Sequence, residues 1–143
     1  MFDLVHDLKV AKTIQAIVGN NTTEGTGVTV DRQGYERVML VFLLGISADT
    51  LSGTVKFLAS VEVSDNDSDW VAAAAGDLIG STLALVDDPA EDDVVQVVEY
   101  IGASRYVRGL VTFTGTHTSG TPIAALAILG NALHNPAGAT QAP

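Results

Sequence analysis

Three aspartates at alternating positions, Asp65, Asp67 and Asp69, are the residues whose type and spacing best suit metal chemistry. They match positions 1, 3 and 5 of a helix–loop–helix calcium loop, which also needs Gly at position 6 and Glu at position 12. Trp70 and Gly76 stand at those two positions. Asp, Asn and Ser are also typical of tight turns, because their side chains bond to nearby backbone N–H groups. The sequence therefore favours a turn without a dedicated metal site, with an incomplete calcium site as the alternative.

A second acidic cluster, DDPAEDD, spans residues 87 to 93 and contains Asp87, Asp88, Glu91, Asp92 and Asp93. Like charges at this density repel one another, which favours a solvated loop. Such a loop could also bind a divalent cation weakly or offer a docking surface to a basic partner. The solvated loop is the favoured interpretation.

No catalytic motif stands out in the sequence. The three histidines, His6, His117 and His134, have no metal-ligand spacing, and no nucleophile elbow, phosphate-binding loop or dinucleotide fingerprint occurs. His117 and Ser119 lie two apart in GTHTSGTP, but a catalytic site needs convergent partners, and none can be located. We expect a protein without enzymatic activity and without a cofactor.

The basic residues form one notable group, in which Arg105 and Arg108 flank Tyr106 in GASRYVRG. An arginine fork can bind a carboxylate through two parallel hydrogen bonds. These arginines could therefore pair with the cluster at residues 87 to 93 of a neighbouring subunit. Partners within the same chain are the equally weighted alternative.

Length and charge exclude several classes of protein. The chain of 143 residues fits one domain and contains no cysteine, so no disulfide or thiolate metal site is expected. Seven Lys and Arg against 17 Asp and Glu give a net charge of −10, which disfavours binding to nucleic acid. Apolar runs fall short of the roughly 18–20 residues of a membrane helix. The opening residues MFDLVHDLKV lack the basic start of a secretory signal, so none is expected.

The pattern of short apolar runs bounded by turn residues predicts an all-β protein. Residues 37 to 46 form a continuous apolar run, which predicts a strand covered on both faces, whereas residues 54 to 63 alternate as a strand with one buried face does. The residues between them resemble a hairpin loop. Further strands are expected at residues 94 to 102, 105 to 115 and 122 to 130. This spacing predicts a single antiparallel β-sandwich or jelly roll of about seven or eight strands.

The two ends are expected to extend from this sandwich. Residues 1 to 20 are predicted to form an N-terminal arm or the first strand, although Leu4, Leu8 and Ala11 would also share one face of a short helix. Residues 21 to 133 form the sandwich, and residues 134 to 143 form a C-terminal arm rich in Pro, Gly and Ala. After the acidic turn, Trp70 is expected to re-enter the sandwich and cover apolar neighbours.

Residues 30 to 137 resemble a family of small tailed-bacteriophage virion proteins. The segments that carry the resemblance are GYE at 34–36, DLIG at 77–80, YIG at 100–102, RYVR at 105–108 and the glycine at 130. The resemblance implies a decoration or cement protein on the outside of the phage head. Proteins of this kind are generally rich in β-structure and commonly form trimers where capsid subunits meet.

The resulting expectation is a non-enzymatic capsid decoration or cement subunit, made in the host cytoplasm and located on the capsid surface. Its expected partners are the major capsid protein and copies of itself in a homotrimer, with no nucleic acid and no membrane. One alternative is a head spike, a head–tail connector or a tail structural protein. Another is a calcium- or carbohydrate-binding β-sandwich module that uses the turn at residues 65 to 69.

Overall fold

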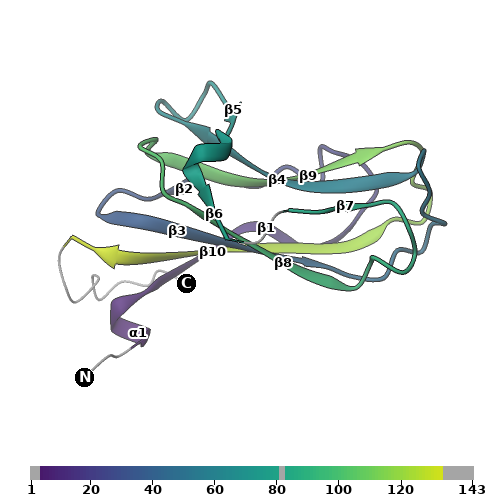
Figure 1. The fold of residues 1–143 in the computed structure, drawn as a ribbon, viewed down its shortest axis with the longest axis horizontal. Helices are drawn as coiled ribbons and strands as arrows, with labels where there is room; N and C mark the ends of the chain where they lie inside the picture. Colours follow the sequence, from purple (N-terminus) through teal and green to yellow (C-terminus); the bar gives the residue numbers. More distant parts are fainter. Residues whose placement is uncertain (1–3, 81–82, 134–143) are drawn as a thin grey trace.

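Strands with alternating apolar residues stack as two antiparallel sheets around a shared core (Figure 1). The structure is a computed structural model and describes residues 4–80 and 83–133. The first sheet, in spatial order, contains β1 (Lys9–Gly19), β10 (Thr121–Ala132), β3 (Tyr35–Leu44), β8 (Val94–Tyr100) and β6 (Leu78–Ile79). The second contains β2 (Val30–Asp31), β9 (Tyr106–Thr114), β4 (Lys56–Ser64) and β5 (Val71–Ala72), with β7 (Leu85–Val86) paired to β4. The all-β antiparallel sandwich predicted from the sequence is confirmed.

The core lies between the sheets and takes every second residue of the long strands. The five strands predicted from the sequence correspond to β3, β4, β8, β9 and β10. Strand β3 contributes Val38, Leu40, Phe42 and Leu44, and β4 contributes Phe57, Ala59, Val61 and Val63. Each fully buried large apolar side chain contributes about 1.5–3 kcal/mol relative to an exposed one. The period of two thus fixes which face of each strand points inward.

The predicted hairpin between the strands at residues 37 to 46 and 54 to 63 is wrong. Strand β3 is hydrogen-bonded to β10 and β8, whereas β4 is bonded to β9 in the other sheet. The connection crosses from one sheet to the other, and its Leu51 is buried in the core. Strands β10 and β8 give β3 apolar partners along nearly its whole length, which a local hairpin with β4 would give on one side only.

The N-terminal region contains both of the structures that the sequence suggested, one after the other. Helix α1 (Leu4–Asp7) is a single turn, and β1 follows it as the edge strand of the first sheet. Strand β1 pairs with β10 from Lys9 opposite Leu129 to Gly19 opposite Thr121, with irregularities between Lys12 and Ile17. Residues 9–19 are therefore the first strand of the sandwich. The predicted C-terminal arm at residues 134–143 lies outside the described residues.

Helices contribute little to the described part of the chain. Besides α1, only the short 3₁₀ helix η1 (Ala75–Asp77) is present there. Neither has the length and apolar character needed to cross a membrane.

Candidate functional site

The acidic turn at residues 65–69 joins β4 to β5, and Asn66 at its centre organises it. The side-chain oxygen Oδ1 of Asn66 accepts hydrogen bonds from the backbone N–H groups of Ser68 (2.9 Å) and Asp69 (2.8 Å). Its amide nitrogen donates to the Asp69 carboxylate (2.7 Å), and the Thr29 hydroxyl donates to Asp67 (2.5 Å). Asp67 also has a left-handed backbone (φ 59°), which Asp tolerates better than most residues. The predicted turn is confirmed, and its polar groups mostly bond to one another.

The three aspartates of this turn are not gathered around a common point. Across residues 4–80 and 83–133, no group of three or more His, Cys, Asp or Glu side chains is placed to hold a metal ion. Asp65 is exposed, while Asp67 and Asp69 bond to Thr29 and Asn66 respectively. The turn is therefore built as a connection between strands.

The second acidic cluster forms the loop between β7 and β8. Its predicted interface residues are Asp87, Asp88, Asp92 and Asp93. The Asp88 carboxylate accepts the N–H of Ala90 (2.8 Å), and the Asp92 carboxylate accepts the N–H of Ser47 (2.8 Å). These bonds shape the loop and attach it to the connection after β3. Asp93 stands at the start of β8 and borders a hollow described below.

His117 is buried and is used for structure. Its Nε2 lies 3.2 Å from the carbonyl oxygen of Lys56 and 3.1 Å from that of Thr114, so this nitrogen carries the proton and donates. Its Nδ1 lies 3.8 Å from the Asp49 carboxylate. A proton-bearing Nε2 that faces carbonyls cannot act as a base toward Ser119. The Asp49–His117–Ser119 neighbourhood therefore lacks the geometry of a nucleophilic triad.

The Asp49 carboxylate is the anchor of the loop that contains His117. It accepts N–H bonds from Thr118 (3.0 Å), Ser119 (2.9 Å) and Gly120 (2.7 Å). These bonds, led by that from Ser119, favour the ionised form and hold the pKa of Asp49 below its ordinary value. The arrangement joins the β3–β4 connection to the β9–β10 connection at one end of the sandwich.

Both arginines of the predicted interface group have carboxylate partners within the chain. Arg105 donates two hydrogen bonds to Asp31 (3.1 and 2.6 Å), which hold the pKa of that carboxyl below its ordinary value. The Arg105 guanidinium also lies 4.9 Å from the centre of the Tyr106 ring. Arg108 pairs with Glu62 across β9 and β4 (2.7 Å). Both guanidinium groups thus have carboxylate partners within the chain, which is the alternative that the sequence left open. Pairing with a neighbouring subunit stays a prediction.

Trp70 does not re-enter the core, so that expectation is wrong. It is half-buried on the outer side of the second sheet, where the Arg108 guanidinium lies 4.1 Å from the centre of its ring. Because Glu62 and Arg108 are opposite each other on the outward side of β4 and β9, the tryptophan is drawn to that side by a cation–π contact. No local pattern in the sequence points to this partner, which lies 38 positions further along the chain.

Arg32 is a structural residue that the sequence did not reveal. It donates to the carbonyl oxygens of Ser104 (2.7 Å) and Glu36 (2.8 Å), and also to that of Gly102. Its guanidinium lies 5.2 Å from the centre of the buried Tyr100 ring, whose hydroxyl accepts the N–H of Ser104 (3.0 Å). The YIG and RYVR segments thus flank a loop that is held by one arginine and one tyrosine.

The outward side of the first sheet is the surface that stands out. Three rows of cross-strand neighbours run over β10, β3 and β8: Ala124–Leu43–Val95, Leu126–Val41–Val97 and Ile128–Met39–Glu99. Strand β1 extends the last two rows with Lys12 and Val10, and β6 adds Ile79 beside Glu99. We call these side chains the apolar face. Leu43 is 43% exposed and Val95 is 61% exposed, so this face is accessible.

The outward side of the second sheet is different in character. Its rows over β4 and β9 are Lys56–Thr114, Leu58–Thr112, Ser60–Leu110 and Glu62–Arg108. Every row contains at least one polar or charged side chain, as is usual for a sheet with one solvated face. The two outer sides of this sandwich therefore have different chemistry, and the apolar one has the character of an interaction surface.

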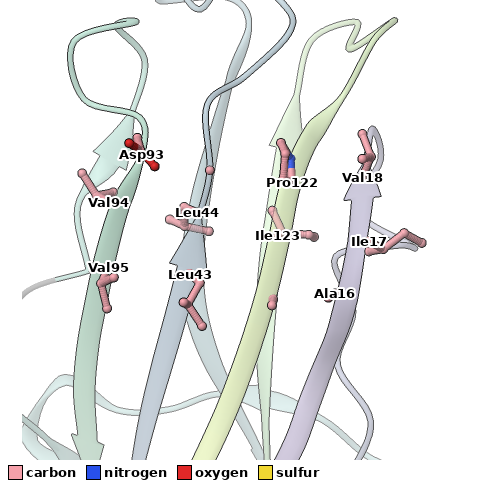
Figure 2. A pocket seen from close by; sticks show the side chains of 12 residues that line it. Ala16, Ile17, Val18, Leu43, Leu44, Asp93, Val94, Val95, Pro122 and Ile123 are labelled. Carbon is pink, nitrogen blue, oxygen red and sulfur yellow. The ribbon is translucent and has the colours of Figure 1, made fainter.

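A hollow of about 630 Å³ opens at one end of the apolar face. Figure 2 shows it across the ends of β8, β3, β10 and β1, with Val95, Leu43, Ile123 and Val18 among its walls. Asp93 stands at its rim, and the other labelled side chains are apolar. An open, shallow and apolar surface of this kind suits contact with another protein more than chemistry on a small substrate.

Comparison with known proteins gives few matches. No family model matches the chain, and no curated protein matches its sequence. Among solved structures, the chain is similar to the SPBc2 prophage-derived protein YomS, with a TM-score of 0.49 and 10% sequence identity. The match covers 87% of this chain and 94% of that one. Similarity at this level does not define a shared function.

Proposed function

We propose that this chain is a virion structural protein, a capsid decoration or cement subunit that binds the outside of a phage head and bridges neighbouring capsomers. The observation that carries the proposal is the apolar face, because an exposed apolar surface of this kind is typical of a contact with another protein. The segments GYE, YIG and RYVR, which resemble those of phage virion proteins, support a place in a phage virion. Such a surface can hold a subunit in place on the regular lattice of a capsid.

Many weak contacts and a high net charge would both suit a cement protein. Contacts that are weak singly become strong when several are made at once on a fixed lattice, because later contacts are effectively intramolecular. A net charge of −10 opposes non-specific aggregation before the chain reaches the capsid. Bridging adjacent capsomers would then resist their separation under the outward pressure of packaged DNA.

Binding to undecorated heads tests the proposal. Purified protein is mixed with heads that lack it, the heads are sedimented, and the bound density is located by electron microscopy. We expect saturable binding with density on the capsid shell, and heads that retain their DNA at higher temperature than undecorated heads. An acidic β-sandwich of unrelated sequence serves as the control for charge. Density confined to the neck or tail would replace the cement function with that of a connector or tail protein.

A further inference from the structure

We infer that the apolar face is the surface on which two copies of this chain stack against each other. The inference deepens the proposed function, on which it rests for the role of this face in assembly, by naming the partner. It commits to a second copy of the chain because three features of the face agree on that occupant. They are its uncovered centre, its area and its distribution of charge.

The centre of the face lacks a cover from the described chain. Strand β3 is apolar on both sides, yet the core covers only the side of Leu40 and Phe42, and Val41 and Leu43 point outward. Helix α1 lies near the end of β10, where Leu8 approaches Gly130, and so leaves the central rows open (Figure 1). A continuous apolar run is typical of a strand buried on both faces. Within residues 4–80 and 83–133 no element supplies that second layer, and a second copy of the chain offers one.

The area of the face suits a two-fold contact. The three rows and the adjoining hollow span about eight residues of four strands that lie about 4.8 Å apart, an area on the order of 500 Å². Two copies would bury roughly 1,000 Å² in total, the size that a specific protein–protein interface should reach. Sheets also pack face to face readily, about 10 Å apart, when their outward side chains interdigitate. The contact would resemble the core that already joins the two sheets of one chain.

The charges on the face are complementary under a two-fold operation. Lys12 lies on β1 and Glu99 on β8, three strands apart and in adjacent rows. A two-fold axis parallel to the strands reverses the strand order in the second copy, so β1 of each copy lies over β8 of the other. Lys12 would then approach Glu99 of the other copy, where Glu99 already bonds Arg37 (3.1 Å). In the two central strands, β10 of each copy would lie over β3 of the other, which brings Leu126 onto Val41 and Ile128 onto Met39.

The principal test compares two leucines of equal exposure on opposite sheets. Leu126 on the apolar face and Leu58 on the outward side of the second sheet are each 37% exposed. Sedimentation velocity of the full chain should show association that depends on concentration. We expect Leu126→Asp to weaken it at least tenfold and Leu58→Asp to leave it unchanged, with circular dichroism confirming that both variants fold. A chain that is monomeric at all concentrations, or an oligomer insensitive to Leu126→Asp, would overturn the inference.

Two further experiments keep the test independent of the folding of Leu126→Asp. Since the chain has no cysteine, Val41→Cys introduces a single thiol at the centre of the face. A short bismaleimide should link two copies of this variant but not two copies of Leu58→Cys. Lys12→Glu should weaken association, and Lys12→Glu combined with Glu99→Lys should restore part of it. Failure of both expectations would also contradict the stacked arrangement.

These measurements separate the inference from the proposed function. Association is measured on the purified chain without any phage head. A monomer that still binds heads would overturn the stacking and leave the cement function in place. An oligomer that Leu126→Asp weakens as expected, but that fails to bind heads, would support the stacking and overturn the cement function.

Discussion

The guanidinium of Arg108 lies between Trp70 and Glu62, 4.1 Å from the centre of the indole ring and 2.7 Å from the carboxylate. This contact joins the segment after the acidic turn to β4 and β9. About four-fifths of each charged side chain is shielded from solvent, so the pair is screened less than a surface ion pair. One arginine thus attaches the turn to the outer side of the second sheet.

We expect Arg108→Ala to lower the free energy of unfolding by about 1–3 kcal/mol, because the ion pair and the cation–π contact are lost together. Chemical denaturation measures the change. Arg108→Lys keeps the charge but not the planar guanidinium group, so its free energy of unfolding should lie between those of Arg108→Ala and the unmodified chain. Arg37→Ala is the matched control, since the Arg37–Glu99 pair is more exposed and its loss should cost less than about 1 kcal/mol. Equal losses at both arginines would contradict this account.

The Asp49 carboxylate makes the stability of the sandwich depend on pH. The bonds from Ser119 and its neighbours hold the pKa of Asp49 below its ordinary value in the folded state. Its contribution to stability is therefore complete above the pKa of the unfolded chain, about 4, and is lost as pH falls through the lower folded pKa. We expect Asp49→Ala to lower Tm clearly at pH 7 and to differ less from the unmodified chain at pH 2. Asp65→Ala, in an exposed turn, controls for the loss of one negative charge. An equal change in Tm in that variant would show that the hydrogen bonds to Asp49 are not the cause.

The loop between β8 and β9 should not tolerate a side chain at Gly102. A Cβ atom at that position would lie 2.4 Å from the hydroxyl oxygen of Tyr100, which is itself fixed by its buried ring. We expect Gly102→Ala to reduce the free energy of unfolding by about 1–3 kcal/mol, as other overpacked sites do. Gly76→Ala is the control, because no atom lies within 4 Å of the Cβ it would add. Its effect should stay within about 0.5 kcal/mol. A neutral Gly102→Ala would show that the loop moves freely.

Calcium should not bind the turn at residues 65–69 tightly. Asp67 and Asp69 accept hydrogen bonds from Thr29 and Asn66, and the turn does not direct its three carboxylates to one point. We expect isothermal titration to show no saturable one-to-one binding in the unmodified chain. Asp67→Ala should give the same trace. Tight binding that Asp67→Ala abolishes would instead favour the calcium-binding module.

Much of the fold could be predicted from local patterns. Alternation of apolar residues in β4 and the continuous apolar runs of β3 and β10 identified strands close to their actual bounds. The residue types of the acidic turn identified it as a turn, because Asn66 bonds to groups within three positions of itself. These features depend on neighbours in the sequence, so they can be seen there.

Pairing between distant segments could not be predicted in the same way. The sequence suggested a hairpin of β3 with β4, but β3 pairs with β10, more than 75 residues away, and with β8. Trp70 was expected in the core and instead lies under Arg108. Arg32 reaches a loop some 70 positions away in the chain. Each of these contacts is decided by which segments the sheets bring together.

By itself, the sequence determined that this chain is an acidic, cysteine-free β protein with two acidic loops and a strand at residues 37 to 46 that is apolar on both sides. Only the tertiary structure decided that the described part of the chain leaves one of those sides uncovered. Whether an outward Val41 meets protein or solvent depends on the layers above its sheet, because a strand fixes the direction of its own side chains and nothing beyond them. The described sandwich has two layers, and the apolar face lies on the outside of one of them, with no third layer over it.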